Sequence, residues 1–190
     1  MAQLDGKKVA ILVADGFELV ELTEPRKALD AAGATTHLVS PAEGKVQGFN
    51  HDTPGDALPV DLPLSGANPS DYDALLLPGG VANPDKLRVI PEAVAFVKAF
   101  FEAGKPVGAI CHAPWTLIEA GVVRGVTMTS WPSLQTDLRN AGADWVDREV
   151  VTDKGLVTSR KPDDIPAFSK KIIEEFAEGR HADQREKAAS

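Results

Sequence analysis

The chain has 190 residues, 43% of them hydrophobic, and a net charge of −8 from 28 acidic and 20 basic residues. This size suits a single α/β domain, and the negative charge argues against partners such as nucleic acid or an anionic membrane surface. One cysteine excludes an intramolecular disulfide, and without a CxxC motif or a cysteine–histidine cluster we expect no metal and no cofactor.

The sequence shows no pattern that directs it to or across a membrane. Its apolar runs are far shorter than the roughly 20 residues of a membrane span, and the N-terminus does not resemble a signal peptide. We therefore expect a cytoplasmic protein, whose single thiol stays reduced.

The first half of the chain is predicted to build parallel strands. Residues 7–14 form an almost continuous apolar run between charged residues, as is typical of a strand buried on both faces. In chain order we expect a strand at 7–14, a helix at 18–32, a strand at 34–40, a short hairpin with loops within 41–70, and a strand at 74–78.

The second half continues the alternation of strands and helices. In chain order we expect a helix at 91–103, a strand at 107–110, a helix at 113–120, a strand at 127–130, a helix at 132–141, a hairpin of 149–152 with 156–159, and a helix at 162–178. This order predicts a three-layer α/β/α sandwich with a mostly parallel sheet. Residues 1–178 form one domain in this interpretation, followed by a polar tail at 179–190.

Cys111 directly follows the strand predicted at 107–110 and precedes a helix. A strand-to-helix turn of this kind, a nucleophile elbow, lifts a reactive side chain above the sheet and directs backbone N–H groups at its target. These donors predict a Cys111 thiolate near neutral pH. The alternative is a buried cysteine that acts as a small hydrophobic residue.

The pair Gly79-Gly80 ends another predicted strand at the same edge of the sheet. Residues without a Cβ let backbone N–H groups approach a ligand closely, so the N–H groups of Gly80 and His112 form a predicted oxyanion hole. The glycine pair could also serve turn geometry alone.

Several segments in order along residues 7–178 resemble the PfpI intracellular protease family of the ThiJ/PfpI superfamily: 14–21, 77–80, 109–114, 141–145 and 159–160. The resemblance implies a flavodoxin-like fold of the class I glutamine amidotransferase type. It also implies homodimers or larger rings, a role in stress resistance, and peptidase, glyoxalase or deglycase activity.

The resemblance also assigns roles to residues. Cys111 corresponds to the family nucleophile, Glu21 to the carboxyl group beside its sulfur, and His112 to a member of a triad-like set. Adjacent side chains diverge on a regular strand or helix, so His112 is either a base or an interface residue. Glu18 either shares the site or complements the dipole of its helix.

The chain departs from the family pattern at the acidic residue and at a second histidine. Asp85 stands where relatives carry a glutamate that reaches the histidine across a subunit interface, and Trp131 stands where one branch has a histidine. Trp131 and Arg160 are candidate pocket residues, with core packing and a surface ion pair as their respective alternatives. We take His181-Ala-Asp183, which mimics an amidotransferase motif, as coincidence.

These observations favour a cysteine-dependent hydrolase or lyase that acts in a stress response on reactive aldehydes or their protein adducts. Its substrates would be small carbonyl compounds or modified proteins, and its protein partners further copies of the chain. An intracellular cysteine peptidase is one alternative. The other is a non-enzymatic sensor of oxidative stress, in which Cys111 is oxidised and Glu21 hydrogen-bonds the product.

Overall fold

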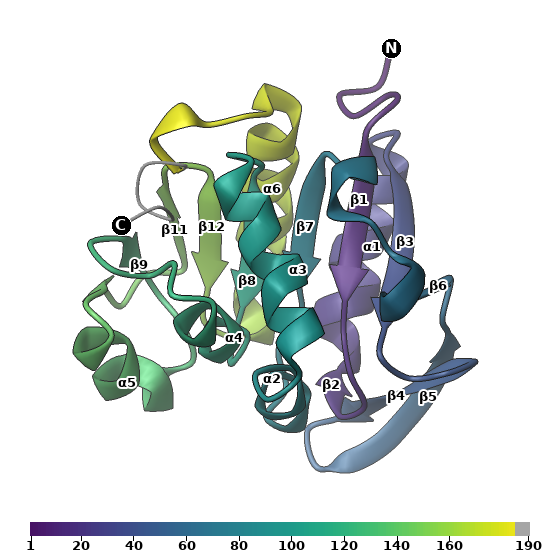
Figure 1. Cartoon of the computed structure of the whole chain (residues 1–190), viewed down its shortest axis with the longest axis horizontal. Coiled ribbons are helices and arrows are strands. Elements are labelled where there is room, and N and C mark those ends of the chain that lie inside the picture. The colour runs from purple at the N-terminus through teal and green to yellow at the C-terminus, as the bar shows by residue number, and fades with distance from the viewer. Residues whose placement is uncertain (185–190) are drawn as a thin grey trace.

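A seven-stranded sheet forms the centre of the protein (Figure 1), and the computed structural model describes residues 1–184. Neighbouring strands are parallel except for the antiparallel edge pair β11 and β12. The order across the sheet is β11 (Val150–Asp153), β12 (Leu156–Ser159), β8 (Val107–Ile110), β7 (Ala74–Leu77), β1 (Lys8–Leu12), β3 (Thr35–Ser40) and β6 (Leu62–Pro63).

Helices cover both faces of this sheet, as the predicted three-layer sandwich requires (Figure 1). One face carries α1 (Leu19–Ala31) and α6 (Ile165–Glu178). The other carries α2 (Ala82–Leu87), α3 (Pro91–Glu102), α4 (Pro114–Glu119) and, at its margin, α5 (Gln135–Asn140). None of the helices in residues 1–184 is long and apolar enough to cross a membrane.

The alternation of side chains along the strands explains the two cores. In β1, Val9 and Ile11 pack against α1 and α6, whereas Ala10 and Leu12 pack on the opposite face with α3. A strand points successive side chains to opposite faces, so an unbroken apolar run supplies both layers at once.

Two small sheets lie outside the central one. The hairpin predicted within 41–70 is β4 (Lys45–Asn50) with β5 (Thr53–Pro59), and β4 also pairs with β2 (Phe17–Glu18). The strand predicted at 127–130 is shorter and does not join the central sheet: β9 (Thr127–Met128) pairs only with β10 (Asp144–Trp145). The strand ends there because Thr129 N–H donates to the side-chain hydroxyl of Thr158 instead of to a backbone carbonyl of a neighbouring strand.

Several helices begin differently from the sequence prediction. Helix α2 falls between the strand predicted at 74–78 and the helix predicted at 91–103, where no helix was predicted; its Pro84 lies in the first turn, where proline is tolerated. The helices predicted to begin at Pro132 and Pro162 start as 3₁₀ turns, η3 (Pro132–Leu134) and η4 (Pro162–Asp164); two others, η1 (Leu64–Gly66) and η2 (Pro69–Asp71), precede β7.

The start of the predicted polar tail packs on the domain. His181 N–H donates to the carbonyl of Gly104 at 2.7 Å, and Gln184 is buried. Residues 179–184 therefore contact the domain, and residues 185–190 lie outside the described part of the chain.

Gly108 in β8 is a position where the core leaves no space for a side chain. A Cβ there would lie 2.7 Å from Cγ2 of Ile172 and 3.2 Å from the ring of Phe168. We expect Gly108→Ala to destabilise the protein by about 1–3 kcal/mol through overpacking, measured by urea unfolding. Gly66→Ala is the control, because the nearest atom is 3.7 Å away. Equal midpoints for the two variants would contradict the expectation.

Candidate active site

Cys111 occupies the turn between β8 and α4 in a backbone conformation that few residues adopt. Its φ is 63°, in the left-handed region, which costs a residue other than glycine about 1–3 kcal/mol. The neighbouring chain holds it there: Cys111 N–H donates to the carbonyl of Ser159, and its own carbonyl accepts from Trp131 N–H. The predicted elbow is therefore a strained and well-anchored turn.

The glycine turn after β7 meets the cysteine turn. The N–H groups of Gly80 and His112 both hydrogen-bond the sulfur of Cys111, and both lower its pKa. Gly80 has a φ of 81°, and a Cβ on it would lie 2.6 Å from the carbonyl oxygen of Gly16. Only glycine fits this close backbone crossing. The two donors of the predicted oxyanion hole are thus brought to one atom.

Asn83 is a residue of this site that the sequence interpretation missed. It is fully buried, its Oδ1 accepts from Ala14 N–H at 2.7 Å, and its Nδ2 donates to the carbonyls of Pro78 and Gly79. These bonds tie the end of β1 to the glycine turn. Its partner Ala14 is distant in the sequence, so nothing in the local sequence indicated this role.

Glu21 reaches the same point from α1. A Cβ on Gly79 would lie 2.5 Å from Oε2 of Glu21 and 2.6 Å from Cβ of Cys111, so the carboxyl and the thiol meet across this glycine. Oε2 accepts from Gly79 N–H at 2.9 Å, while the buried Oε1 has no hydrogen-bond partner among the described residues. Burial raises the pKa of Glu21 to about 8, and the charge of Glu18 contributes to the rise. Glu21 is therefore protonated at neutral pH.

The prediction of a Cys111 thiolate near neutral pH is wrong for the protein without substrate. Burial raises the pKa of the thiol most, and the charge of Glu21 raises it further once that carboxyl is ionised; together they outweigh the two N–H donors, which lower it. The thiol and the carboxyl lose their protons as a coupled pair. A thiolate has to be formed by transfer of its proton to a neighbouring group.

His112 is placed to accept that proton. Its Nδ1 lies 3.1 Å from Sγ of Cys111, because the left-handed turn brings together two side chains that would diverge on a regular strand. The ring stacks on Trp131 with centroids 5.6 Å apart. Burial lowers the pKa of His112 to about 4, so the imidazole is neutral at pH 7.

A cavity of about 660 Å³ opens above these groups. The structure places six predicted residues on its wall: Glu18, Glu21, Gly80, Cys111, His112 and Trp131. Eight further lining residues were not predicted, among them Phe49, His51, Asp52 and Lys86. The first three come from the β4–β5 hairpin, whose position depends on long-range pairing with β2.

Glu18 is the N-cap residue of α1, and its side chain lies on this wall. Its carboxylate accepts from His51 N–H at 3.1 Å and makes no capping bond to α1. This contact fixes the tip of the hairpin over the cavity.

Two predicted residues do not reach the cavity within the chain. Asp85 is exposed on α2 and does not contact His112, so the expected contact across a subunit interface stays a prediction. Arg160 does not line the cavity: its guanidinium binds Asp147 at 2.8 Å and the buried Asp164 at 2.9 Å. The ion-pair alternative for Arg160 is the one that the structure supports.

Residues 7–175, which are most of the chain, match the DJ-1/PfpI family. The chain belongs to the DJ-1/PfpI family. This membership confirms the resemblance in the sequence. Deglycase TK1284 of Thermococcus kodakarensis is 43% identical over 166 residues, which are 87% of this chain and 97% of the relative.

Two further comparisons agree with DJ-1/PfpI membership. General stress protein 18 of Bacillus subtilis is 45% identical over 169 residues, 88% of this chain and 96% of the relative. The crystal structure of Drosophila melanogaster DJ-1beta superposes with a TM-score of 0.82 at 28% identity and covers 96% of this chain and 95% of its own. The sandwich is thus the fold of this family.

Proposed function

We propose that this DJ-1/PfpI protein is a cysteine-dependent hydrolase for reactive aldehydes, such as methylglyoxal, or for their adducts on proteins, and that it acts in a cytoplasmic stress response. The observation that carries the proposal is the sulfur of Cys111, held between the N–H groups of Gly80 and His112 at the floor of a cavity. Relatives named deglycase and general stress protein support the class of activity.

The first step is addition of the thiol to an aldehyde carbon. The S–C bond forms while the C=O π electrons move to oxygen, where the N–H groups of Gly80 and His112 stabilise the charge. The proton of the thiol passes to Nδ1 of His112, 3.1 Å away, and then to that oxygen. The product is a hemithioacetal.

With methylglyoxal, the hemithioacetal rearranges to a thioester as a proton moves from the first carbon to the second through an enediol. Water then cleaves the thioester, releases lactate and restores the thiol, so that one methylglyoxal and one water give one lactate. The different surroundings of Glu21 and His112 shift their pKa values in opposite directions, and this difference identifies the acid and the base. Protonated Glu21, with a pKa of about 8, is the acid beside the sulfur, and neutral His112, with a pKa of about 4, is the base.

The number of turnovers per chain tests the proposal. With methylglyoxal in excess, we expect each chain to convert many molecules of it to lactate. An enzymatic assay of lactate measures this number. An alternative has one observation in its favour: the unpartnered Oε1 of Glu21 next to the sulfur could hydrogen-bond an oxidised cysteine. Modification that stops at one equivalent per chain, together with sulfinic-acid formation in mild peroxide, would replace the enzyme by this sensor.

The peptidase alternative requires an acidic residue beside His112. We expect a homodimer or a larger ring in which Asp85 of one subunit approaches His112 of another, since within one chain Asp85 is exposed and away from the cavity. Light scattering at micromolar concentration measures the assembly. Asp85→Ala and His112→Ala should then impair turnover non-additively, as groups that act together do.

Asp163→Ala is the control for this test, because it removes another exposed carboxylate from outside the cavity wall. A monomer would exclude the contact across subunits. Strictly additive effects in an oligomer would leave Asp85 without a role in the reaction.

A further inference from the structure

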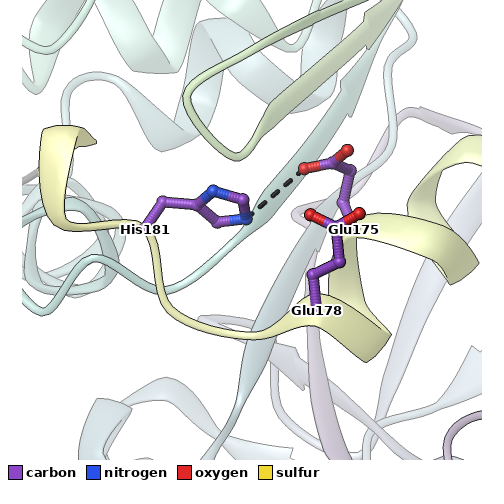
Figure 2. Close-up of side chains that lie close together, drawn as sticks. All are labelled: Glu175, Glu178 and His181. Carbon is purple, nitrogen blue, oxygen red and sulfur yellow. Dashed lines mark ion pairs between the residues drawn. The ribbon is translucent and has the colours of Figure 1, made fainter.

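A second group of functional side chains lies at the edge of the sheet opposite Cys111. Glu175 and Glu178 lie on the last turns of α6, and His181 follows the helix (Figure 2). Figure 2 shows the two carboxylates and the imidazole pointing toward one another. One candidate ligand atom from each residue lies within 4.8 Å of the others.

The position of His181 is set by the sheet and not by α6 alone. Its N–H donates to the carbonyl of Gly104, which precedes β8, and its ring lies on Gly155 in the β11–β12 turn. A Cβ on Gly155 would lie 2.6 Å from Cδ2 of the ring. Glycine therefore leaves the space that lets the imidazole face α6.

The contact between His181 and Glu175 has the spacing of two metal ligands. Nε2 of His181 lies 3.4 Å from Oε2 of Glu175, yet this buried nitrogen has no hydrogen-bond partner in residues 1–184. Two ligands at about 2.0–2.2 Å from a tetrahedral zinc ion are separated by roughly 3.3–3.6 Å. The two atoms are thus spaced to share a cation.

The surroundings also favour a cation. The side chain of Glu175 is 10% exposed, and the last turn of α6 contains no basic residue, although the carbonyl end of a helix favours positive charge. Two carboxylates in this place repel each other and the helix dipole. Beside the His181 ring, the amide of Gln184 is also buried without a hydrogen-bond partner among the described residues.

We propose that Glu175, Glu178 and His181 bind a divalent cation of the zinc class, which fastens the segment after α6 to the sheet. Two carboxylate oxygens and one imidazole nitrogen suit zinc, and a water molecule completes four-coordination. The two carboxylates balance the charge of the ion. This site differs from the expectation of no metal, which rested on the lack of a CxxC motif or a cysteine–histidine cluster. His181 belongs to the segment His181-Ala-Asp183, which was taken as a coincidental motif.

Calorimetric titration with zinc chloride tests the site. The titration uses the Cys111→Ser chain, so that the thiol cannot bind zinc at the other edge of the sheet. We expect one zinc ion per chain. When Glu175→Gln or His181→Ala is added to the Cys111→Ser chain, the affinity for zinc should fall by at least about tenfold. Glu174→Gln is the matched control, because this neighbouring carboxylate is paired with Lys171. The affinity of this variant for zinc should not change.

Glu178→Gln keeps the test decisive if a buried substitution disturbs folding, since Glu178 is exposed. It should also weaken zinc binding about tenfold or more. Zinc should raise the Tm of the Cys111→Ser chain and not that of the variant that also carries Glu178→Gln. Absence of binding by the Cys111→Ser chain, or equal affinity in the Glu178→Gln and Glu174→Gln variants, would overturn the proposal.

Discussion

Cys111→Ser is expected to lower kcat/KM for methylglyoxal by at least about a thousandfold, because no other group in the cavity can form the thioester. Serine has nearly the same shape, but its hydroxyl is a far weaker nucleophile than a thiol. The measurement is initial lactate formation at several substrate concentrations.

Because the chain has one cysteine, chemical modification of thiols affects Cys111 alone. Alkylation of the wild-type chain with one equivalent of iodoacetamide should remove the same activity, since Cys111 is the only thiol. Thermal unfolding of Cys111→Ser and Cys111→Ala provides the control for folding. A serine variant that kept a tenth of wild-type turnover would move the chemistry to another residue.

Glu21→Gln is expected to stabilise the protein, by about 3 kcal/mol at pH 7, although it alters the candidate active site. Glutamine has the shape of the protonated acid, and its Oε1 can accept from Gly79 N–H as Oε2 of Glu21 does. The folded protein holds the Glu21 proton up to a pKa of about 8, whereas the unfolded chain releases it near the ordinary value of 4.5. The wild-type protein therefore loses stability as pH rises between these values, and the variant does not.

The difference between the two unfolding free energies should grow by roughly one kcal/mol per pH unit across that window and level off above it. Urea unfolding at a series of pH values measures it. Glu24→Gln is the control, because it removes an exposed carboxyl from the same helix. A difference that does not change with pH would show that Glu21 is ionised in the folded protein.

Local sequence patterns were enough to predict six of the seven strands of the central sheet, all but β6, and the position of the nucleophile. The strand β8 is an apolar run that stops at Cys111, and a strand followed at once by a helix start has few other geometries. The Gly79-Gly80 turn followed from the same logic. Each of these features depends on residues that are adjacent in the chain.

Features that depend on distant parts of the chain were not predicted. The pKa of Cys111 follows from burial beneath several elements and from Glu21, which lies ninety positions away along the sequence. Asn83 acts by bonding Ala14 at the end of another strand. The contact of His112 with the sulfur was judged difficult because a regular backbone was assumed, whereas Cys111 has a positive φ.

The β4–β5 hairpin separates selectivity from reactivity in this site. It contributes Phe49, His51 and Asp52 to the cavity wall, yet it belongs to a sheet distinct from the one that ends at Cys111. Neither of the two oxyanion donors, Gly80 and His112, belongs to the hairpin, which joins the site through the pairing of β4 with β2 and the bond from His51 to Glu18. Exchanging this hairpin between family members is therefore a way to redesign which carbonyl compounds enter while the thiol chemistry is inherited unchanged, and natural divergence can follow the same route.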